Sequence, residues 1–417
     1  MANLPSTLSV PDRRQRFRAF MKRFNPTAPA KAAIGEGLIY QSPGRSIFRK
    51  LAAAADLTPG SQQLLTGGIG SGKTTELLMA QDELVSHGAM PVYIDISAET
   101  DLSALNSGAL LASLGIRLGE IIRSKFDWSQ GLAEAYGAIQ KAAYGYQREA
   151  WVPDDEYAYP EPYDRQNYEP GRYQTIHVPG KIKPTFPALR RDVQDLAQPV
   201  SKLTGFLKEQ KIDVVAIFDG LDRLIQMDKF WLVAEQDLRA LRPLEISVLA
   251  AGPLSILYGR GREVKDYFDE VHYLPPAVAD PRVSPFLLEV LLLRGAGELM
   301  NRDQMQKLCL ASGGVLRDLI SLGRGAGENA YLDDLDAIED KHVDRSIEQL
   351  ASSYLLGLGT RQNAILLKLL DGGSFTPSDP ENMELLITRR VLERPESRYE
   401  VHPALATLLQ HTAKGDS

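Results

Sequence analysis

The chain has 417 residues, of which 44% are hydrophobic and 24% charged, which is enough for roughly two to three domains of about 150 residues each. Its 47 lysines and arginines are outnumbered by 54 aspartates and glutamates. The resulting net charge of −7 argues against a protein that coats nucleic acid with its whole surface.

The cysteine count and the hydropathy pattern predict the compartment. Cys309 is the only cysteine, so an internal disulfide is excluded, and no Cys/His cluster has the spacing of zinc ligands. No stretch stays apolar for the roughly 18 to 20 residues that cross a bilayer, and the N-terminus lacks the apolar core of a signal peptide. We therefore expect a soluble, cytoplasmic protein.

The first predicted element is a helix in the basic segment 1–34. An apolar stripe recurs at helical spacing, and six basic residues surround it. The stripe contains Phe17, Phe20, Met21 and Phe24, and the basic residues are Arg13, Arg14, Arg16, Arg18, Lys22 and Arg23. Either the phenylalanines dock the helix on the core and leave the arginines solvated, or the basic face contacts phosphate, an acidic partner or a membrane surface.

Residues 35–277 alternate short apolar strands with helical patterns, which predicts an α/β domain with a parallel sheet. Strands are expected at 63–66, 91–96, 213–219, 246–252 and 271–274. Helices are expected over KTTELLMAQDELVSHG and SALNSGALLASLGIRLGEIIRS, which follow the first two strands.

Residues 142–187 interrupt this core with seven of the 16 tyrosines, mixed with prolines and acidic residues. The segment shows neither a helix period nor a strand period, so it predicts a long loop. Tyrosines and prolines are common at interfaces, which favours a surface for a partner or for self-assembly. The alternative is a variable surface insertion without a function of its own.

The C-terminal third predicts two smaller domains. Residues 278–356 contain consecutive helical patterns and are expected to form a helical lid. Residues 357–417 contain two or three helices followed by a β-hairpin whose turn is expected at Pro395–Ser397. That order of elements is typical of a winged-helix domain.

The strongest chemical signal is GGIGSGKT, which satisfies the P-loop pattern between a strand and a helix. Phosphate oxygens need converging backbone N–H groups, and glycines let the loop wrap closely around the anion. Lys73 supplies charge to the β/γ-phosphates, Thr74 offers a hydroxyl to Mg²⁺, and the helix dipole adds to both. The expected cradle consists of Gly67, Gly68, Ile69, Gly70, Ser71, Gly72, Lys73, Thr74 and Thr75.

A second anchor for the metal is expected in DVVAIFDGLDR, where a buried strand ends in Asp219. A carboxylate held there beside Thr74 can orient the water shell of Mg²⁺. Many ATPases place a glutamate next, as the base that polarises water, but this chain has Gly220. Hydrolysis is therefore expected to be slow or dependent on a partner. Asp222 either replaces the base or forms a surface pair with Arg223.

Two further positions bear on detection of the γ-phosphate. The strand 246–252, expected between the P-loop strand and the Asp219 strand, offers only Ala250, Ala251 and Gly252 where related ATPases often carry a polar residue. The alternative is that Ser255, just after this strand, replaces the missing polar residue. In the lid, SGGVLRDL places Arg317 one turn inside a helix, where its guanidinium can report on the γ-phosphate. The alternative pairs Arg317 with Asp318 or another carboxylate.

These motifs resemble the AAA+/STAND class of P-loop ATPases, particularly NACHT-like members of bacterial type, over residues 35–410. The resemblance rests on GGIGSGKTTEL, PVYIDIS, FDGLDRL, SGGVLRDLI and the C-terminal winged helix. It implies ATP or ADP between core and lid, Mg²⁺, and nucleotide exchange that controls assembly. It also implies that His402, in YEVHPAL, contacts the ADP β-phosphate, although only the histidine of the family's short block is present. The structural alternative is a core histidine under the wing.

Three functions remain open at this stage. The favoured one is an ATP-dependent switch that controls assembly or a protein effector, plausible in bacterial signalling or antiviral defence. A DNA-associated AAA+ ATPase is second, with Arg389, Arg390, Arg394 and Arg398 on phosphates, but neighbouring glutamates disfavour nucleic acid. The third is a scaffold without useful hydrolysis, or a metabolite kinase. The nucleobase is expected near Ile39 and Tyr40, and the sequence does not decide between ATP and GTP.

Overall fold

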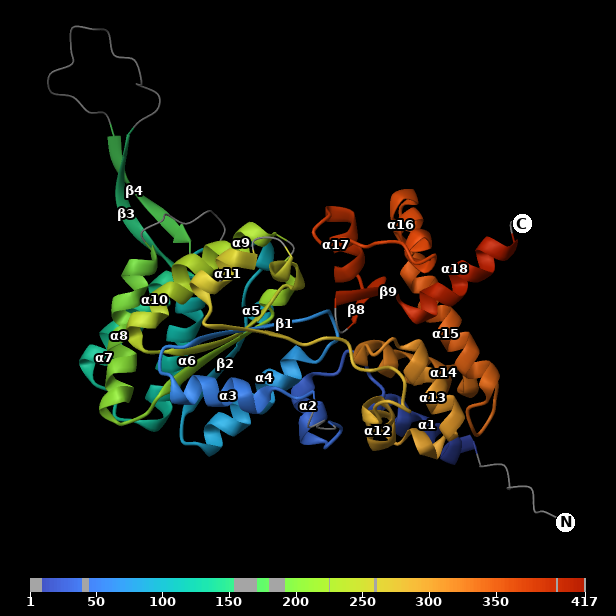
Figure 1. The fold of residues 1–417 in the computed structure, drawn as a ribbon. Helices are drawn as coiled ribbons and strands as arrows, with labels where there is room; N and C mark the ends of the chain where they lie inside the picture. The colour runs from blue at the N-terminus through green and yellow to red at the C-terminus, as the bar shows by residue number, and fades with distance from the viewer. Residues whose placement is uncertain are drawn as a thin grey trace, which may run out of the picture. The chain divides into compact units, whose positions relative to one another are not determined.

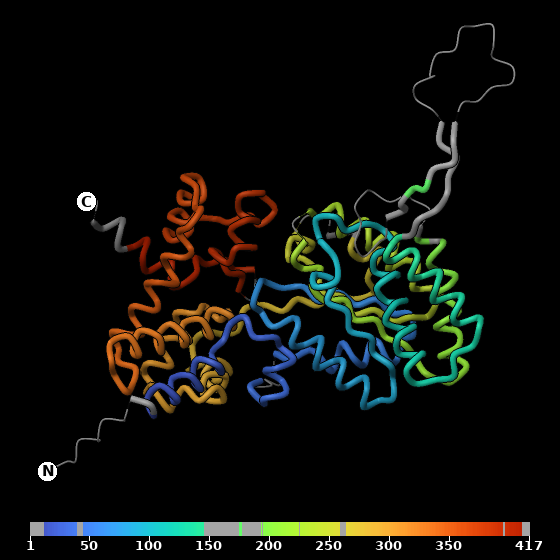
Figure 2. Tube along the Cα trace, turned by 180° about the vertical axis from the view of Figure 1, so that it is seen from behind, coloured from blue at the N-terminus to red at the C-terminus, as the bar shows by residue number. Residues whose placement is uncertain are grey.

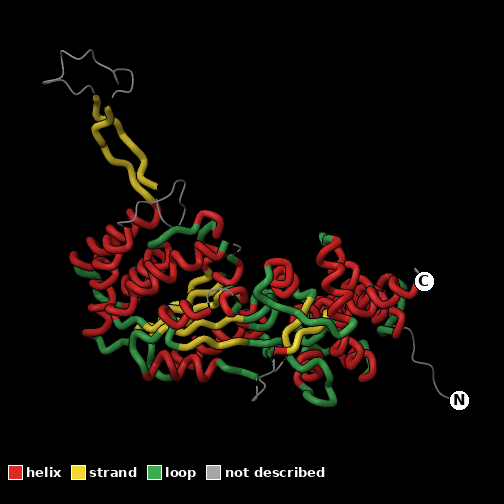
Figure 3. The backbone as a smooth tube through the Cα atoms, turned by 45° about the horizontal axis from the view of Figure 1, so that its top comes forward, coloured by secondary structure: helices red, strands yellow, loops and turns green. Residues whose placement is uncertain are grey.

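The computed structural model describes residues 10–39, 45–153, 171–179, 192–224, 226–258, 261–394 and 397–415 (Figure 1). A five-stranded sheet forms the centre of the α/β part, and its strands appear in yellow in Figure 3. The strands are β1 (Gln62–Thr66), β2 (Met90–Asp95), β5 (Val214–Asp219), β6 (Ser247–Gly252) and β7 (Glu270–Tyr273).

The sheet is parallel and its strand order is β2-β5-β6-β1-β7. All residues of β1, β5 and β6 are buried, as expected for continuous apolar runs in a sheet that helices cover on both faces. The five predicted strands are confirmed within one residue at each end, and β6 lies between β1 and β5, as expected.

The described residues form two compact units. One consists of Met1–Ala53, Gln63–Glu83 and Ala251–Ser417, and the other of Ala54–Gln62 and Leu84–Ala250. The helices up to β6 are α1 (Val10–Arg23), α2 (Ala30–Gly35), α3 (Phe48–Leu57), α4 (Lys73–Ser86), α5 (Ile96–Glu99), α6 (Ala109–Lys125), α7 (Gln130–Tyr144), α8 (Asp192–Glu209), α9 (Met227–Val233) and α10 (Arg239–Leu241).

Helix α6 starts six residues later than the pattern of SALNSGALLASLG predicted. Gly108 precedes it with a φ of +89°, which interrupts helical geometry. The fully buried carboxylate of Asp237 accepts hydrogen bonds from the N–H groups of Gly108, Leu110 and Leu111. A side chain 129 residues away therefore caps this helix, and no local signal indicates it.

The prediction of a structureless loop at 142–187 was wrong in part. Helix α7 runs through Tyr144, and strands β3 (Gly145–Pro153) and β4 (Gly171–Pro179) pair in antiparallel register, Gly145 opposite Pro179 and Pro153 opposite Gly171. The hairpin extends away from α7 and α8 (Figure 1). Each strand is stabilised by pairing with the other across the intervening residues, so the local sequence of neither one predicts a strand. Residues 154–170 and 180–187 lie outside the described residues.

The N-terminal helix α1 belongs to the helical lid. Phe17, Phe20 and Phe24 are buried in the same apolar cluster as the lid helices, and α1 lies beside them in Figure 2. Gly323 and Gly327 of the lid lie so close to the rings of Phe24 and Phe20 that a Cβ would not fit. The docking interpretation is therefore confirmed.

The basic residues of α1 are less solvated than expected. Arg13 binds Asp334 and the carbonyl of Leu335, and Arg23 forms a double hydrogen bond with Glu298. Arg14 and Arg18 stay exposed. Most of the basic face is thus engaged within the chain rather than presented to phosphate or a membrane.

Helix α11 (Gly261–Tyr267) lies between β6 and β7 in the chain and belongs to the α/β part. The lid itself contains α12 (Phe286–Leu293), α13 (Arg302–Ala311), α14 (Leu316–Leu332) and α15 (Asp340–Leu355). Cys309 is buried in α13, and this burial raises the pKa of its thiol to about 12, in agreement with a structural role. None of the helices in the described parts of the chain has the length and apolarity needed to cross a membrane.

The C-terminal elements have the predicted winged-helix order: α16 (Thr360–Leu370), α17 (Pro380–Ile387), β8 (Val391–Arg394), β9 (Arg398–Val401) and α18 (Pro403–Gly415). Strands β8 and β9 pair in antiparallel fashion, and the predicted hairpin is confirmed. Pro395 and Glu396 of its turn lie outside the described residues. An apolar cluster that includes Leu366, Leu385 and Leu405 holds these helices together.

Candidate nucleotide-binding site

The P-loop joins β1 to α4, and Lys73 is the first residue of that helix. Gly70 has a φ of +79°, which side chains rarely adopt. Gly67 is needed for a different reason, because a Cβ there would lie 2.5 Å from the carbonyl oxygen of Leu274. At Gly68 a Cβ would meet nothing within 4 Å, so the loop is open to a ligand at this residue.

The polar groups of the loop fit a phosphate ligand. Lys73 is buried, and its Nζ donates to the carbonyls of Gly67 at 2.8 Å and Gly68 at 3.1 Å. The hydroxyl of Ser71 is buried without a hydrogen-bond partner in the structure. The N-terminus of α4 adds the positive end of the helix dipole. A bound phosphate would satisfy these donors, while Thr74 and Thr75 lie half-buried at the helix start.

Two residues that the sequence did not single out brace this loop. Arg45 donates from Nη2 to the carbonyls of Ser71 at 2.6 Å and Pro275 at 3.2 Å. Burial lowers the pKa of Arg45, against the opposing charge of Glu76. Glu76 of α4 accepts hydrogen bonds from the N–H groups of residues 47 and 48. The segment before β1 thus supports the loop backbone. Ile39 is half-buried, and Tyr40 lies outside the described residues.

The lid touches the loop through Arg317. A Cβ on Gly70 would lie 2.7 Å from the Cβ of Arg317, so the first turn of α14 packs directly on the P-loop. Its neighbour Asp318 points elsewhere: it pairs with Arg389 at 2.6 Å and accepts a hydrogen bond from Tyr354. Asp318 is thus engaged by Arg389 and Tyr354. The role of Arg317, as a reporter of the γ-phosphate or as the partner of a carboxylate, stays a prediction.

His402 lies beneath the wing rather than on the P-loop. It is fully buried, its Nε2 is 3.3 Å from Asp318, and its ring centroid lies 4.7 Å from that of Tyr354. Arg389, Tyr354 and His402 thus all lie against the carboxylate of Asp318. Burial alone would raise the pKa of Asp318, but the neighbouring His402 and the charge of Arg389 outweigh burial and lower it.

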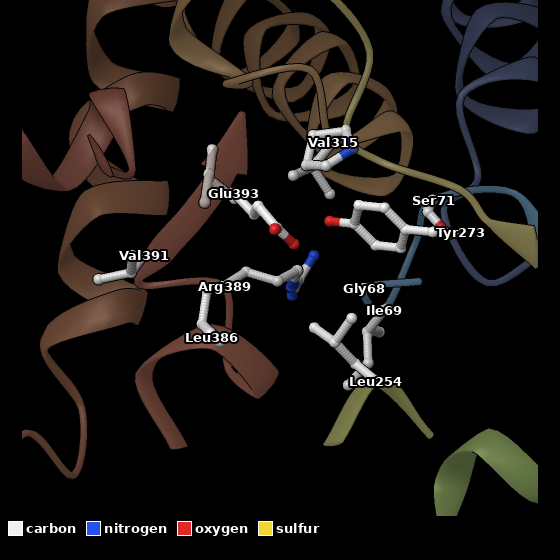
Figure 4. Close-up of a pocket in the computed structure, with 12 residues that line it drawn as sticks. Gly68, Ile69, Ser71, Leu254, Tyr273, Val315, Leu386, Arg389, Val391 and Glu393 are labelled. Atoms are coloured by element: carbon white, nitrogen blue, oxygen red, sulfur yellow. The ribbon is translucent and has the colours of Figure 1, made fainter. Parts of the chain in front are cut away.

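A pocket joins the P-loop to the winged-helix residues within the same compact unit (Figure 4). Arg389, Glu393 and Tyr273 direct their polar ends into it, and Ile69 and Leu254 form an apolar side. The complete lining is Gly68, Ile69, Ser71, Leu254, Tyr273, Pro276, Val315, Leu386, Arg389, Val391, Leu392 and Glu393. His402 is not part of this lining.

The expected metal anchor Asp219 ends β5 and is buried. Its carboxylate accepts hydrogen bonds from the N–H of Gly220 at 2.8 Å and from the hydroxyl of Tyr93 at 2.6 Å. Burial and the Asp219 charge raise the pKa of Tyr93, which keeps this hydroxyl a donor. No sequence pattern indicates a role for Tyr93, because a tyrosine in a strand is usually a packing residue.

Gly220, which stands where many ATPases have glutamate, has a φ of +85°. A Cβ there would lie 2.7 Å from a carboxylate oxygen of Asp95, so a glutamate does not fit without rearrangement. Asp222 follows in a short 3₁₀ turn, Leu221–Arg223, and Arg223 donates to the hydroxyl of Ser97. On β6, Ala250 and Ala251 are fully buried and leave that strand end apolar, as expected.

No family model matches the chain, and no curated protein matches it significantly. Among solved structures, the Cdc6p protein of Pyrobaculum aerophilum is 14% identical, with 95% of this chain and 98% of that chain covered and a TM-score of 0.41. The Orc1 protein of Aeropyrum pernix in complex with DNA is 15% identical, with 95% and 96% covered and a TM-score of 0.40. The RuvB Holliday junction branch migration motor of Thermotoga maritima is 14% identical, with 87% and 93% covered and a TM-score of 0.38.

The strand order, the P-loop after β1, the acidic end of β5, the helical lid and the winged helix are features of the structure itself. The chain thus has an α/β fold with a P-loop and a parallel sheet whose strand order is of AAA+ type, followed by a helical lid and a winged-helix domain.

Proposed function

We propose that the chain binds ATP and ADP with Mg²⁺ and acts as a nucleotide-controlled switch. One arrangement carries this proposal: a P-loop with a buried lysine, a lid arginine packed on its Gly70, and winged-helix residues around a shared pocket. A ligand that bridges these parts differently in two nucleotide states shifts their equilibrium.

The roles of the residues follow from their positions. Lys73 exchanges the carbonyls of Gly67 and Gly68 for the β/γ-phosphates, and Arg317 reports on the γ-phosphate. Thr74 and Asp219 would hold Mg²⁺, which supplies charge neutralisation to the phosphates when bound. Because Gly220 replaces the usual glutamate, water is poorly polarised unless Asp222 or a partner does it. Slow hydrolysis suits a switch, which needs two long-lived states rather than rapid turnover.

The biological setting is proposed from the motif resemblance. A STAND-type switch of bacterial type controls a protein effector or its own assembly, and signalling or antiviral defence is the setting that we favour. Nucleic acid remains the less favoured partner. Arg389 pairs with Asp318, Arg390 donates to the carbonyl of Tyr354, and Arg394 binds Glu400, so these candidate phosphate contacts are engaged inside the chain.

Sedimentation velocity with phosphate-release assays tests the switch. We expect different sedimentation with ADP and with a non-hydrolysable ATP analogue, both with Mg²⁺, and slow release of phosphate. The difference should disappear in Lys73→Ala. Identical sedimentation and identical protease-cleavage patterns in the two nucleotides would argue for a scaffold, and phosphate transfer to a small acceptor would argue for a kinase.

A further inference from the structure

Arg389 occupies a strained position between α17 and β8. Its φ is +64°, in the left-handed region that is unfavourable for a non-glycine residue. Helix α17 ends at Ile387, and the N–H of Arg389 still bonds to the carbonyl of Leu386, so the residue turns the chain out of the helix. Such a turn is ordinarily made by glycine or asparagine.

The side chain of Arg389 is held from one side. Nη1 donates to Asp318 at 2.6 Å, and the guanidinium lies 5.7 Å from the ring centroid of Tyr354. Nε, in contrast, is buried and has no hydrogen-bond partner in the structure. A guanidinium carries five N–H donors in a planar fork that suits two oxygens of one anion. The present contacts leave part of that capacity unused.

The unused donor belongs to a side chain that lines the pocket with the P-loop. Among the described residues that line the pocket, Arg389 is the only cation, and Gly68, Ile69 and Ser71 of the P-loop lie in the same lining. In Figure 4 its guanidinium points into the space that these residues share. Gly68 is the loop residue at which a Cβ would meet nothing, so this side of the loop is open.

We propose that Arg389 is a phosphate ligand contributed by the winged-helix domain, which exchanges Asp318 for the terminal phosphate of bound ATP. This proposal rests on the proposed function and names a residue for it. The release of Asp318 then changes the contacts of Tyr354 and His402, which share its carboxylate. The terminal phosphate is thereby read by the wing as well as by the lid.

The geometry favours Arg389 over His402 for this task. His402 is fully buried against Asp318, whereas 20% of the Arg389 side chain is exposed. Glu393 faces the same pocket and accepts hydrogen bonds from Tyr258 and Tyr399. Its charge opposes an anion, so the arginine is needed to make the pocket accept phosphate.

Calorimetric titration of the full chain with Mg²⁺ and either ADP or a non-hydrolysable ATP analogue tests the proposal. We expect Arg389→Ala to weaken the ATP analogue roughly tenfold and ADP by less than about threefold, because one charge-assisted contact to the terminal phosphate is lost. Arg389→Lys keeps the charge without the fork and should recover part of the preference. The matched control is Arg361→Ala, an exposed winged-helix arginine paired with Glu381.

Thermal unfolding without nucleotide shows which variants fold, and Arg389→Lys carries the test if the alanine variant does not. Folded Arg389 variants whose ratio of ATP to ADP affinity equals that of the unchanged protein would overturn the role of Arg389 while leaving nucleotide binding intact. An unchanged protein that binds neither nucleotide would overturn the proposed function itself, and this inference with it.

Discussion

Arg389, at the start of the wing, and Asp318, on lid helix α14, form an ion pair of 2.6 Å between side chains that are 20% and 4% exposed. The residue before Asp318 is Arg317, whose Cβ packs on Gly70 of the P-loop. Two consecutive residues of one helix therefore face the phosphate loop and the wing. Movement of α14 at one contact would displace the other contact, which is the coupling that the proposed switch requires.

Replacement of Gly67 tests whether the loop needs its close approach to β7. Gly67→Ala should destabilise the fold by about 1–3 kcal/mol, because the new Cβ would lie 2.5 Å from the Leu274 carbonyl. Gly137→Ala is the control: it lies inside α7 with nothing near a Cβ and should stabilise by about 0.5–1 kcal/mol. Urea denaturation gives both values. Equal effects of the two changes would contradict the close approach.

Removal of the Phe20 ring tests the attachment of α1 to the lid. Phe20 is fully buried and stacks on Phe24 with a centroid separation of 4.3 Å. Phe20→Ala should lower the free energy of unfolding by about 3–5 kcal/mol, as other large-to-small core changes do. Arg18→Ala, at an exposed position of the same helix, should change it by less than about 0.5 kcal/mol. A small effect of Phe20→Ala in denaturation curves would mean that α1 is a detachable arm.

Asp219→Asn separates metal-dependent chemistry from nucleotide binding. We expect Mg²⁺-dependent phosphate release to fall at least roughly tenfold while ADP affinity changes much less, because the lost charge acts on the metal shell. Asp228→Asn, an exposed change in α9, serves as control. If release and affinity fall together and the thermal midpoint drops, the carboxylate holds Tyr93 and Gly220 for folding instead.

His272 predicts a pH dependence of stability. Burial first, and then the charge of Lys50, lower its pKa, against the opposing effect of Glu270. The folded protein therefore keeps His272 neutral, bonded to Gln63 at 2.9 Å, while the unfolded chain takes up a proton near its ordinary pKa of about 6.5. The free energy of unfolding should fall as the pH drops from about 7 to about 5. His272→Gln should flatten this slope in urea titrations, and an unchanged slope would exclude His272 as its source.

The parallel sheet and the P-loop were predictable because their signals are local. An apolar run bounded by turns specifies a buried strand, and the glycine spacing of the P-loop specifies its backbone path, so both were placed within a residue or two. The hairpin β3–β4 was missed since its strands are stabilised by each other across a long separation. Asp237, which caps α6 from afar, was missed for the same reason.

The polar network of the wing shows the same limit. In the sequence, Arg389 is one of four basic residues near a predicted hairpin, and Asp318 is the neighbour of Arg317. Neither pattern indicates that the two residues pair. Their pairing joins residues that are 71 positions apart and depends on how the winged helix packs on the lid. Tyr93 could not be identified from the sequence for a related reason. Its hydroxyl donates to Asp219 only because β2 and β5 are paired in the folded sheet.

The central claim is that Lys73 and its loop bind the phosphates of a nucleotide, and titration of the chain with ATP analogue and Mg²⁺ in a calorimeter tests it most directly. We predict saturable heat from the unchanged protein and a loss of affinity of at least roughly tenfold in Lys73→Ala, with Lys50→Ala, an exposed lysine paired with Glu270, unaffected. No heat from the folded, unchanged protein, or equal affinity after removal of Lys73, would contradict the account.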